Sequence, residues 1–446
     1  MYITIFINKI FNLKIPPTNI MLITLLLALL IDKYILFNTG FQFSYITSFS
    51  LIISTKKTKQ IKNKYLKTLY ISYICFLVSF PLCIYNDSSL NILSIITNII
   101  MIPLVSIIIF PLILITFIIP YTNNILIILI KLLETTNILI NKITILNLIV
   151  TKPPISIIII YYILIYISFT KPIINILLYL LILINILYPY INNQYIVTFL
   201  DIGQGDSIFI KYPHNQNNII IDTGGIQNSS NYSLTNSKTI PYIKSLGINT
   251  IHYLIITHGD YDHMGEAINL VNNFKVEKVI FNCGEFNDLE KELITVLDKK
   301  HIKYYSCIKE LNVDNSKLYF LGTKEYDNEN DNSNVIYTEL NGHKFMFMGD
   351  ASITTEKEIL SKYNIPDIDV LKVGHHGSKT SSSKEFINEI NPKYSVISVG
   401  KNNRYGHPNK EVLENLKNSK IYRTDKNGSI MFKIKNNKLK IEICNP

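Results

Sequence analysis

The strongest constraint on the fold is a series of long apolar segments in residues 1–192. A helix that crosses a bilayer needs about 20 predominantly apolar residues. The segments near or above that length are 19–38, 40–54, 69–85, 91–120, 154–169 and 172–189. A signal peptide is the alternative for the first segment, but no small-residue cleavage site follows it and apolar segments continue. The sequence therefore predicts a multi-pass transmembrane α-helical region over residues 1–192.

Charge separates this region from the rest of the chain. Residues 1–192 carry 13 lysines and three acids, with no arginine or histidine, whereas residues 193–446 carry equal numbers of basic and acidic residues and all nine histidines. The lysines lie between uncharged apolar segments, so they indicate the flanks of membrane spans rather than a surface for nucleic acid. Any attraction between residues 193–446 and a polyanion has to come from local patches or a bound metal.

Two features bear on the topology of the membrane region. The segment KKTKQIKNKYLK, residues 56–67, contains six lysines and no acid, so the positive-inside rule predicts a cytoplasmic loop. The run 91–120 is long enough for one tilted span or two short ones. We expect Pro103, Pro111 and Pro120 to kink or break it.

A polar stripe is expected on one further helix. Lys131, Glu134, Asn137 and Asn141 recur at spacings of three, three and four, which places them on one helical face. Such a stripe either lines a passage through the membrane or faces water from a helix that lies in the interface. The interfacial helix is the favoured interpretation.

The number and spacing of the cysteines do not indicate a set of disulfides or a zinc site. Five are present, an odd number without CxxC spacing: Cys75, Cys83, Cys283, Cys307 and Cys444. Neither a disulfide framework nor a sulfur-ligated zinc site is indicated. We expect these residues to serve packing.

From residue 193 onward, short apolar runs alternate with Gly, Asn, Asp and Pro, which is typical of a globular α/β domain. One run, 251–256, is followed at once by His258, Asp260, Asp262 and His263. The carboxyl ends of strands in α/β sheets commonly carry functional sites, and imidazole and carboxylate groups together bind Zn, Mn or Fe. The alternative is a hydrophilic turn in which Asp262 caps the next helix. Four potential ligands in six residues favour the metal site.

Comparable patterns recur three times downstream. HKFMFMGDAS ends an apolar run at Asp350, DIDVLKVGHHGS ends one at His375 and His376, and KYSVISVGKNNRYGHP leads to His407. In each, glycine permits a tight turn and a residue type that binds metal follows. The spacing alone does not decide which of His375 and His376 would be a ligand. Together the four segments predict one shared site.

These motifs resemble the metallo-beta-lactamase fold, and within it the soluble domain of ComEC-type DNA-uptake proteins. The resemblance covers residues 195–446 and rests on FLDIGQGDSIFI, IIDTGG, MGDAS, LKVGHHGSKTSSS, YGHP and YRTDKNGSI beside the histidine cluster. In the membrane region, LFNTGFQFSYITSFSLII is similar to a segment of the competence channel domain. The resemblance implies an αββα sandwich for residues 193–446, which follows the transmembrane region.

The resemblance also implies roles for individual residues. Two divalent ions, Zn or Mn, would be held by His258, Asp260, Asp262, His263, Asp350 and His375. His376 and His407 would approach the substrate as catalytic residues, and Asp222 would orient the cluster.

Two departures from the family stand out. Asp260 occupies the position of a histidine that is common in the superfamily, as is usual in the uptake branch, and no histidine precedes Asp350, where Asn332 and Ser333 are the best local match. One of the two metal sites is therefore expected to be weak. The chain also lacks an N-terminal soluble domain and early spans of its relatives, which leads us to expect a shortened or split member of the family.

The function that follows is a cell-membrane protein of DNA uptake. Its C-terminal domain is predicted to lie on the outer face and to act as a metal-dependent hydrolase, a deoxyribonuclease that degrades one strand. Expected partners are DNA, the lipid bilayer, other competence proteins and further copies of the chain. Two alternatives stay open: a hydrolase of a small ester or phosphorylated substrate, and a non-catalytic transport component.

Overall fold

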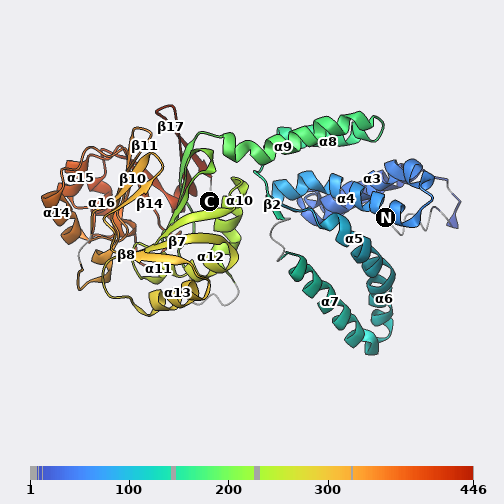
Figure 1. The fold of residues 1–446 in the computed structure, drawn as a ribbon, viewed down its shortest axis with the longest axis horizontal. Coiled ribbons are helices and arrows are strands. Elements are labelled where there is room, and N and C mark those ends of the chain that lie inside the picture. The colour runs from blue at the N-terminus through green and yellow to red at the C-terminus, as the bar shows by residue number, and fades with distance from the viewer. Residues whose placement is uncertain are drawn as a thin grey trace. The chain divides into compact units, whose positions relative to one another are not determined.

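The computed structural model describes residues 8, 10–12, 14–141, 147–225, 232–322 and 325–444. The chain divides into two compact units, Met1–Ile186 and Leu187–Pro446 (Figure 1).

The first unit consists mainly of apolar helices and also contains a two-stranded antiparallel sheet of β1 (Ser89–Asn91) and β2 (Asn147–Ile149). Four stretches are long and apolar enough to cross a membrane, namely Lys64–Asn86, Ser94–Ile118, Pro120–Ile140 and Pro172–Ile191, and two shorter ones are Pro17–Ile31 and Ile155–Ser168. The helices are α2 (Pro17–Ile31), α3 (Thr39–Gln60), α4 (Lys64–Asn86), α5 (Ser94–Pro103), α6 (Phe110–Ile118), α7 (Asn123–Asn141), α8 (Ile155–Ser168) and α9 (Asn175–Ile191). The predicted multi-pass helical region is confirmed.

Two of the three prolines in the run 91–120 do not end the helix. A π-helical turn, Leu104–Ile109, joins α5 to α6. The N–H of Phe110 bonds to the carbonyl of Val105 across this wide turn, and widening of this kind accommodates the N–H that Pro111 lacks. The helix ends at Ile119, which has φ −122° and ψ 87°, because the residue before a proline disfavours the helical region.

The lysine-rich segment 56–67 is largely helical rather than a loop. Helix α3 continues to Gln60, and Asn63 caps α4 by accepting hydrogen bonds from the N–H groups of Tyr65 and Leu66. Asn side chains are among the best helix caps. The lysines are thus grouped around a three-residue turn, which corrects the predicted loop.

The polar stripe lies on α7, between two of the predicted spans, in a stretch that was not itself predicted to cross the membrane. Lys131, Glu134 and Asn137 are all exposed on this helix. Their hydrophobic neighbours still make Pro120–Ile140 apolar enough to cross a membrane. Whether the stripe lines a passage or lies in the interface stays a prediction.

The second unit is a sandwich of two sheets with helices on both outer faces (Figure 1). The eight-stranded sheet has the order β17-β16-β3-β4-β5-β6-β7-β8, and the seven-stranded sheet has the order β15-β14-β13-β12-β11-β10-β9. The first sheet comprises β3 (Tyr195–Phe199), β4 (Ile208–Lys211), β5 (Asn218–Ile221), β6 (Thr250–Ile255), β7 (Lys275–Phe281), β8 (Lys303–Ser306), β16 (Ser429–Lys435) and β17 (Lys438–Cys444). The second comprises β9 (Glu310–Val313), β10 (Ser316–Phe320), β11 (Ile336–Leu340), β12 (His343–Phe347), β13 (Val370–Lys372), β14 (Tyr394–Ile397) and β15 (Lys420–Arg423).

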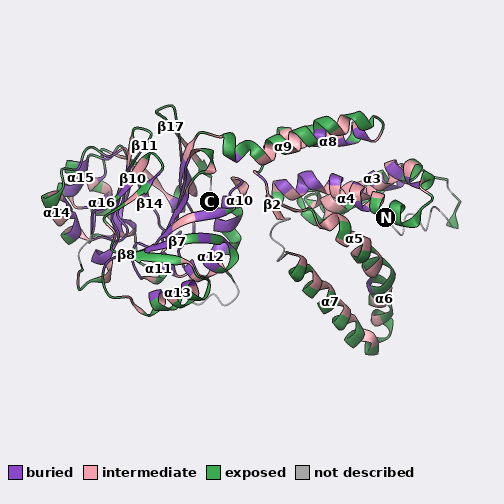
Figure 2. Ribbon diagram, in the orientation of Figure 1, coloured by how far each residue is buried: buried purple, intermediate pink, exposed green. Residues whose placement is uncertain are grey.

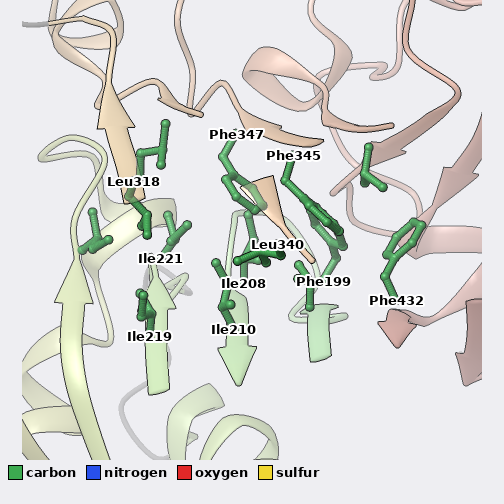
Figure 3. Packing of buried hydrophobic residues seen from close by; sticks show 14 of the residues in the cluster. Phe199, Ile208, Ile210, Ile219, Ile221, Leu318, Leu340, Phe345, Phe347 and Phe432 are labelled. Atoms are coloured by element: carbon green, nitrogen blue, oxygen red, sulfur yellow. The ribbon is translucent and has the colours of Figure 1, made fainter. Parts of the chain in front are cut away.

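The principal core lies between the two sheets. Phe345 and Phe347 of β12 face Phe199 of β3 across the sandwich (Figure 3), and the strands are mostly buried whereas the helices keep an exposed face (Figure 2). The outer face of the seven-stranded sheet packs on α14 (Ile353–Lys362), α15 (Lys384–Ile390) and α16 (Lys410–Asn415). The helices of the other face are α10 (Ile240–Ser245), α12 (Ala267–Asn273) and α13 (Asp288–Lys299). The αββα architecture expected from the resemblance is confirmed.

Strand register brings distant loops to one edge of the sandwich. In the eight-stranded sheet, Phe199, Ile221 and Ile255 lie on one line of paired residues across β3, β4, β5 and β6. In the seven-stranded sheet, Phe347 pairs with Lys372, which pairs with Val396. The segments that follow these strand ends therefore emerge at the same edge of their sheets. These are the segments in which the sequence places its candidate ligands.

The cysteine prediction was wrong for one pair. Cys283 and Cys307 form a disulfide, with Cα atoms 4.4 Å apart. They follow the ends of β7 and β8, which are parallel neighbours with Phe281 opposite Ser306. Strand pairing that only the fold creates thus brings together two cysteines separated by 24 residues. Cys75, Cys83 and Cys444 are free.

Phe432 joins the two sheets at the core. Its ring packs edge-on against Phe199 of its own sheet and against Phe345 of the other, and it is fully buried. Because the unit encloses its own core, we expect residues 187–446 to fold as a separate fragment.

Phe432→Ala is therefore expected to lower the free energy of unfolding of that fragment by about 3–5 kcal/mol, since it leaves a cavity between the sheets. Urea unfolding monitored by circular dichroism measures the loss. Lys435→Ala, at an exposed position of the same strand, should change the free energy by less than about 0.5 kcal/mol. Equal effects of the two substitutions would contradict the assignment of Phe432 to the core.

Candidate metal centre

The candidate residues are gathered on segments that follow strands of both sheets. Asp222 follows β5, and His258 follows β6. From the second sheet come Asp350 after β12 and His376 after β13. Their side chains are at most 4% exposed. A buried group of this kind needs compensating partners for each polar atom.

The segment after β6 is shaped to turn one histidine inward. Asp260 occupies the N-cap position of the one-turn helix α11 (Tyr261–Met264), and this turn buries His263 while Tyr261 stays exposed. The glycine-rich segment 201–207 packs against it closely: a Cβ on Gly205, at φ +119°, would lie 2.2 Å from the Asp262 carbonyl oxygen. Only glycine fits this approach.

Asp222 orients His263 from behind. Its Oδ2 lies 2.8 Å from His263 Nδ1 and accepts a hydrogen bond of 2.6 Å from the Thr257 hydroxyl, while Oδ1 accepts the Thr257 N–H at 2.8 Å. With φ +58°, Asp222 holds a backbone conformation that aspartate tolerates better than most residues. This arrangement leaves His263 Nε2 directed away from Asp222, toward Asp350 Oδ1 at 3.1 Å.

Two other imidazoles are held through Nδ1. His376 Nδ1 lies 3.0 Å from the carbonyl oxygen of Ser398. His258 Nδ1 lies 3.1 Å from the Thr257 hydroxyl and 3.3 Å from the Ser333 hydroxyl. A partner on one ring nitrogen fixes the ring and leaves the other nitrogen for a metal.

The remaining donor atoms converge and lack hydrogen bonds. Nε2 of His258, His263 and His376 and Oδ1 of Asp350 are all buried without a hydrogen-bond partner. Ligand atoms lie within 4.8 Å of one another in the sets His258, His263, Asp350 and Asp262, His263, His376. Because unpaired buried polar atoms are costly, this donor set fits one or more divalent ions bound by nitrogen and carboxylate oxygen.

The other predicted residues lie at the rim. Asp260 has a half-exposed side chain, with Oδ2 3.5 Å from His258 Nε2. His375 Nε2 lies 3.7 Å from Asp350 Oδ2, and the His407 ring centroid is 6.0 Å from that of His375. Among the described residues, the clusters that could hold an ion include His376 but not Asp260, His375 or His407. The geometry thus favours His376 over His375 as the ligand, the reverse of the roles expected from the resemblance.

Charges inside the site shift the protonation of its groups. Burial lowers the pKa of His263, but Asp350 and Asp222 raise it well above its ordinary value. Burial raises the pKa of Asp262, but the His376 imidazole, whose Nε2 lies 3.3 Å from Asp262 Oδ2, and the charge of His263 bring that pKa below the ordinary range. Protons on imidazoles therefore balance the carboxylates when no metal is bound. Binding of a divalent cation should release them.

The sequence reasoning missed a buried ion pair. Lys372 and Asp206 pair with each other at 0% and 1% exposure, and Lys372 Nζ also donates to the Gly349 carbonyl at 3.3 Å. Asp206 lies 3.7 Å from His376 Nδ1 and 3.9 Å from His263 Nδ1, behind both rings. The signal in the sequence was a lysine inside the apolar run VLKV, because lysine is rarely buried without a partner.

Ser333 stands where a superfamily histidine was expected. It is fully buried, and its hydroxyl contacts His258 Nδ1 and accepts the Asp350 N–H at 3.1 Å. A Cβ on Gly349 would lie 2.9 Å from the Ser333 Cβ. Ser333 thus links the candidate ligands His258 and Asp350. It leaves little room for a side chain at position 349.

Comparison with known proteins identifies both parts of the chain. Residues 1–173 match the Competence protein family, and residues 200–401 match the metallo-beta-lactamase superfamily. The chain joins a domain of the Competence protein family to a metallo-beta-lactamase domain. The family recognised from the sequence motifs is confirmed, and this domain is of a class that typically binds divalent metals such as zinc and acts as a hydrolase.

Relatives of this chain share modest identity with it. ComE operon protein 3 of Bacillus subtilis (strain 168) is 29% identical over 95% of this chain and 59% of its own length. Competence protein ComA of Neisseria gonorrhoeae is 27% identical over 54% of this chain and 32% of its own length. The solved structure of the metallo-beta-lactamase fold protein YhfI from Bacillus subtilis matches with a TM-score of 0.38 at 13% identity, over 54% of this chain and 100% of that one. This chain spans less than two thirds of the length of the two curated relatives.

The contribution of the buried Lys372–Asp206 ion pair to stability can be tested without a substrate. Lys372→Met leaves Asp206 charged and unpaired, so it should destabilise residues 187–446 by about 3–5 kcal/mol. The double variant Lys372→Met, Asp206→Leu should recover part of this loss, because no buried charge remains unpaired. Urea unfolding of Lys372→Met, Asp206→Leu and the double variant measures the coupling. Strictly additive losses would contradict the pairing.

Proposed function

We propose that the C-terminal domain is a metal-dependent phosphodiesterase that cleaves DNA during its uptake through the membrane. The observation that carries the proposal is the set of buried, converging Nε2 and Oδ1 atoms that form no hydrogen bonds, in a chain that joins a competence domain to a metallo-beta-lactamase domain. Competence proteins handle DNA, and a two-ion site of nitrogen and carboxylate ligands suits phosphodiester hydrolysis.

We assign the ligands from the geometry. His258, His263 and Asp350 would hold one ion, and Asp262 and His376 would hold the other, with Asp350 close to both sets. Asp260 would complete the first set, from a half-exposed position. The first ion would be the weaker one, because Ser333 offers a hydroxyl to His258 where relatives supply an imidazole.

When bound, the ions would supply the positive charge that activates water and stabilises the phosphoryl oxygens. Around them, the protein holds its ligands rigid: Asp222 and the Ser398 carbonyl fix two imidazoles, and the Asp206–Lys372 pair lies behind the same rings. The preorganised ligands reduce the reorganisation needed during reaction.

His375 and His407 are the proposed proton carriers. Burial is the first cause of a lowered pKa for each imidazole, and for His407 the neighbouring His376 and His375 lower it further. Both rings are therefore neutral near pH 7. A neutral ring at the rim can take a proton from the attacking water and return it to the leaving oxygen.

We also propose that this domain lies on the outer face of the membrane. The Cys283–Cys307 disulfide supports this side, since disulfides persist in oxidising compartments. With residues 56–67 in the cytoplasm, the outer face requires an odd number of later crossings. The four candidate spans all follow that segment, so the 14-residue helix α8 would be a fifth crossing.

The nuclease proposal is tested with residues 187–446 on labelled single- and double-stranded DNA in Mn²⁺ or Zn²⁺. Asp262→Ala should lower cleavage by at least about 100-fold, since loss of a ligand exceeds the cost of losing an outer partner. It should also lower the amount of metal retained after dialysis. Asp298→Ala, at an exposed position of α13, serves as the control. Retained metal without any turnover would instead favour a non-catalytic transport component, and cleavage of small esters alone a different substrate.

Protease treatment of intact cells tests the orientation. An external domain should be digested without permeabilisation, while a cytoplasmic marker protein survives. If the domain is protected until the cells are lysed, it faces the cytoplasm.

A further inference from the structure

A cleft of about 670 Å³ opens beside the metal centre. Asp260 and Asp262 line it from the ligand segment, and Arg404 and Tyr405 line it from the segment after β14. Pockets that hold small ligands generally measure 300–1,000 Å³. The cleft thus has room for about one nucleotide-sized group next to the proposed reaction site.

Arg404 is unusual for this chain. Only two of its 43 basic residues are arginines, Arg404 and Arg423. Arg423 forms a two-pronged ion pair with Asp425, through Nε at 2.9 Å and Nη2 at 2.6 Å. Arg404 is exposed and forms no ion pair within the part of the chain that the structure describes. Arginine binds the oxygens of carboxylate and phosphate groups in the same two-pronged way, which lysine cannot do.

Tyr405 provides an aromatic surface beside it. Tyr405 is 55% exposed, and its ring lies nearly parallel to that of His407 with centroids 5.8 Å apart. The guanidinium carbon of Arg404 lies 5.0 Å from the Tyr405 ring centroid, and Arg404 Nη2 donates a hydrogen bond of 2.8 Å to the Tyr405 hydroxyl. Asn403 fixes the segment, because it accepts the His407 N–H at 3.0 Å and donates to the His407 carbonyl at 2.8 Å. The braced loop therefore holds the exposed ring at a fixed place on the wall of the cleft.

We propose that Arg404 and Tyr405 bind single-stranded nucleic acid, the guanidinium holding a backbone phosphate and the tyrosine ring stacking on an unpaired base. This inference rests on the proposed function and names the strand form that the site accepts. A base can lie on an aromatic ring only when it is not paired in a duplex. Tyr405 is linked through His407 and His375 to Asp350, so a strand anchored here passes the metal centre.

Binding is measured with the full chain in detergent, by fluorescence anisotropy of a labelled single-stranded oligonucleotide in EDTA, which prevents metal-dependent cleavage. Tyr405→Ala should weaken binding by about 5- to 150-fold, the range for loss of one stacked base. Tyr405→Phe should bind within about twofold of the wild type, because the ring remains. Arg404→Ala should reduce the slope of log K against log salt by about 0.7, the value for one phosphate of a single strand.

Three comparisons complete the test. An oligonucleotide without bases should bind the wild type and Tyr405→Ala equally, since the ring then has nothing to stack on. Arg404→Lys should recover the salt slope but only part of the affinity. Lys438→Ala, an exposed lysine at the opposite end of β17 from the site, should leave binding unchanged, and the thermal melting of every variant reports whether it is folded.

The two proposals fail separately. Equal affinity of wild type, Arg404→Ala and Tyr405→Ala for the single strand, or an equal loss in Lys438→Ala, overturns this inference even if the chain cuts DNA. Selective loss in the Arg404 and Tyr405 variants supports it even if the wild type cuts nothing, in which case only the nuclease proposal fails.

Discussion

Burial of several ionisable groups at one point is the constraint on which the rest of this domain depends. Imidazoles and carboxylates within a few ångströms of one another, out of water, are costly unless each atom finds a partner. In this protein the outward ring nitrogens are hydrogen-bonded to other groups of the protein. His263 Nδ1 bonds to Asp222, and His376 Nδ1 bonds to the Ser398 carbonyl. The inward atoms face one another, with His263 Nε2 3.1 Å from Asp350 Oδ1, and form no hydrogen bonds that meet normal geometry. The inward nitrogen and oxygen atoms are therefore available to bind a cation.

The two-sheet sandwich makes this arrangement possible. Parallel pairing on β5, β6 and β7 in one sheet and on β12, β13 and β14 in the other sends successive chain segments out at one edge. The aromatic core around Phe199, Phe345 and Phe432 holds the sheets face to face. Candidate ligands more than 100 residues apart in the chain are thus positioned by a rigid scaffold rather than by loops alone.

Several parts of the fold and site could be predicted because the signals are local. Apolar runs of about 20 residues mark helices whatever their neighbours are, and the cluster from His258 to His263 is visible within six positions. The π-helical turn around Leu104–Ile109 was not predictable in this way, because Pro103 and Pro111 are usually helix breakers. Likewise the lysines around Asn63 resemble a loop until the cap on α4 is known.

The sequence by itself determined that the chain has an apolar helical region followed by a domain with imidazoles and carboxylates at strand ends. Only the tertiary structure decided which of these groups meet. It distinguished buried His376 from His375 at the rim, paired Lys372 with Asp206, and joined Cys283 to Cys307. The physical reason is that composition and periodicity act along the chain, whereas ligation, ion pairing and disulfide formation depend on distances that exist only once strands far apart in sequence are paired.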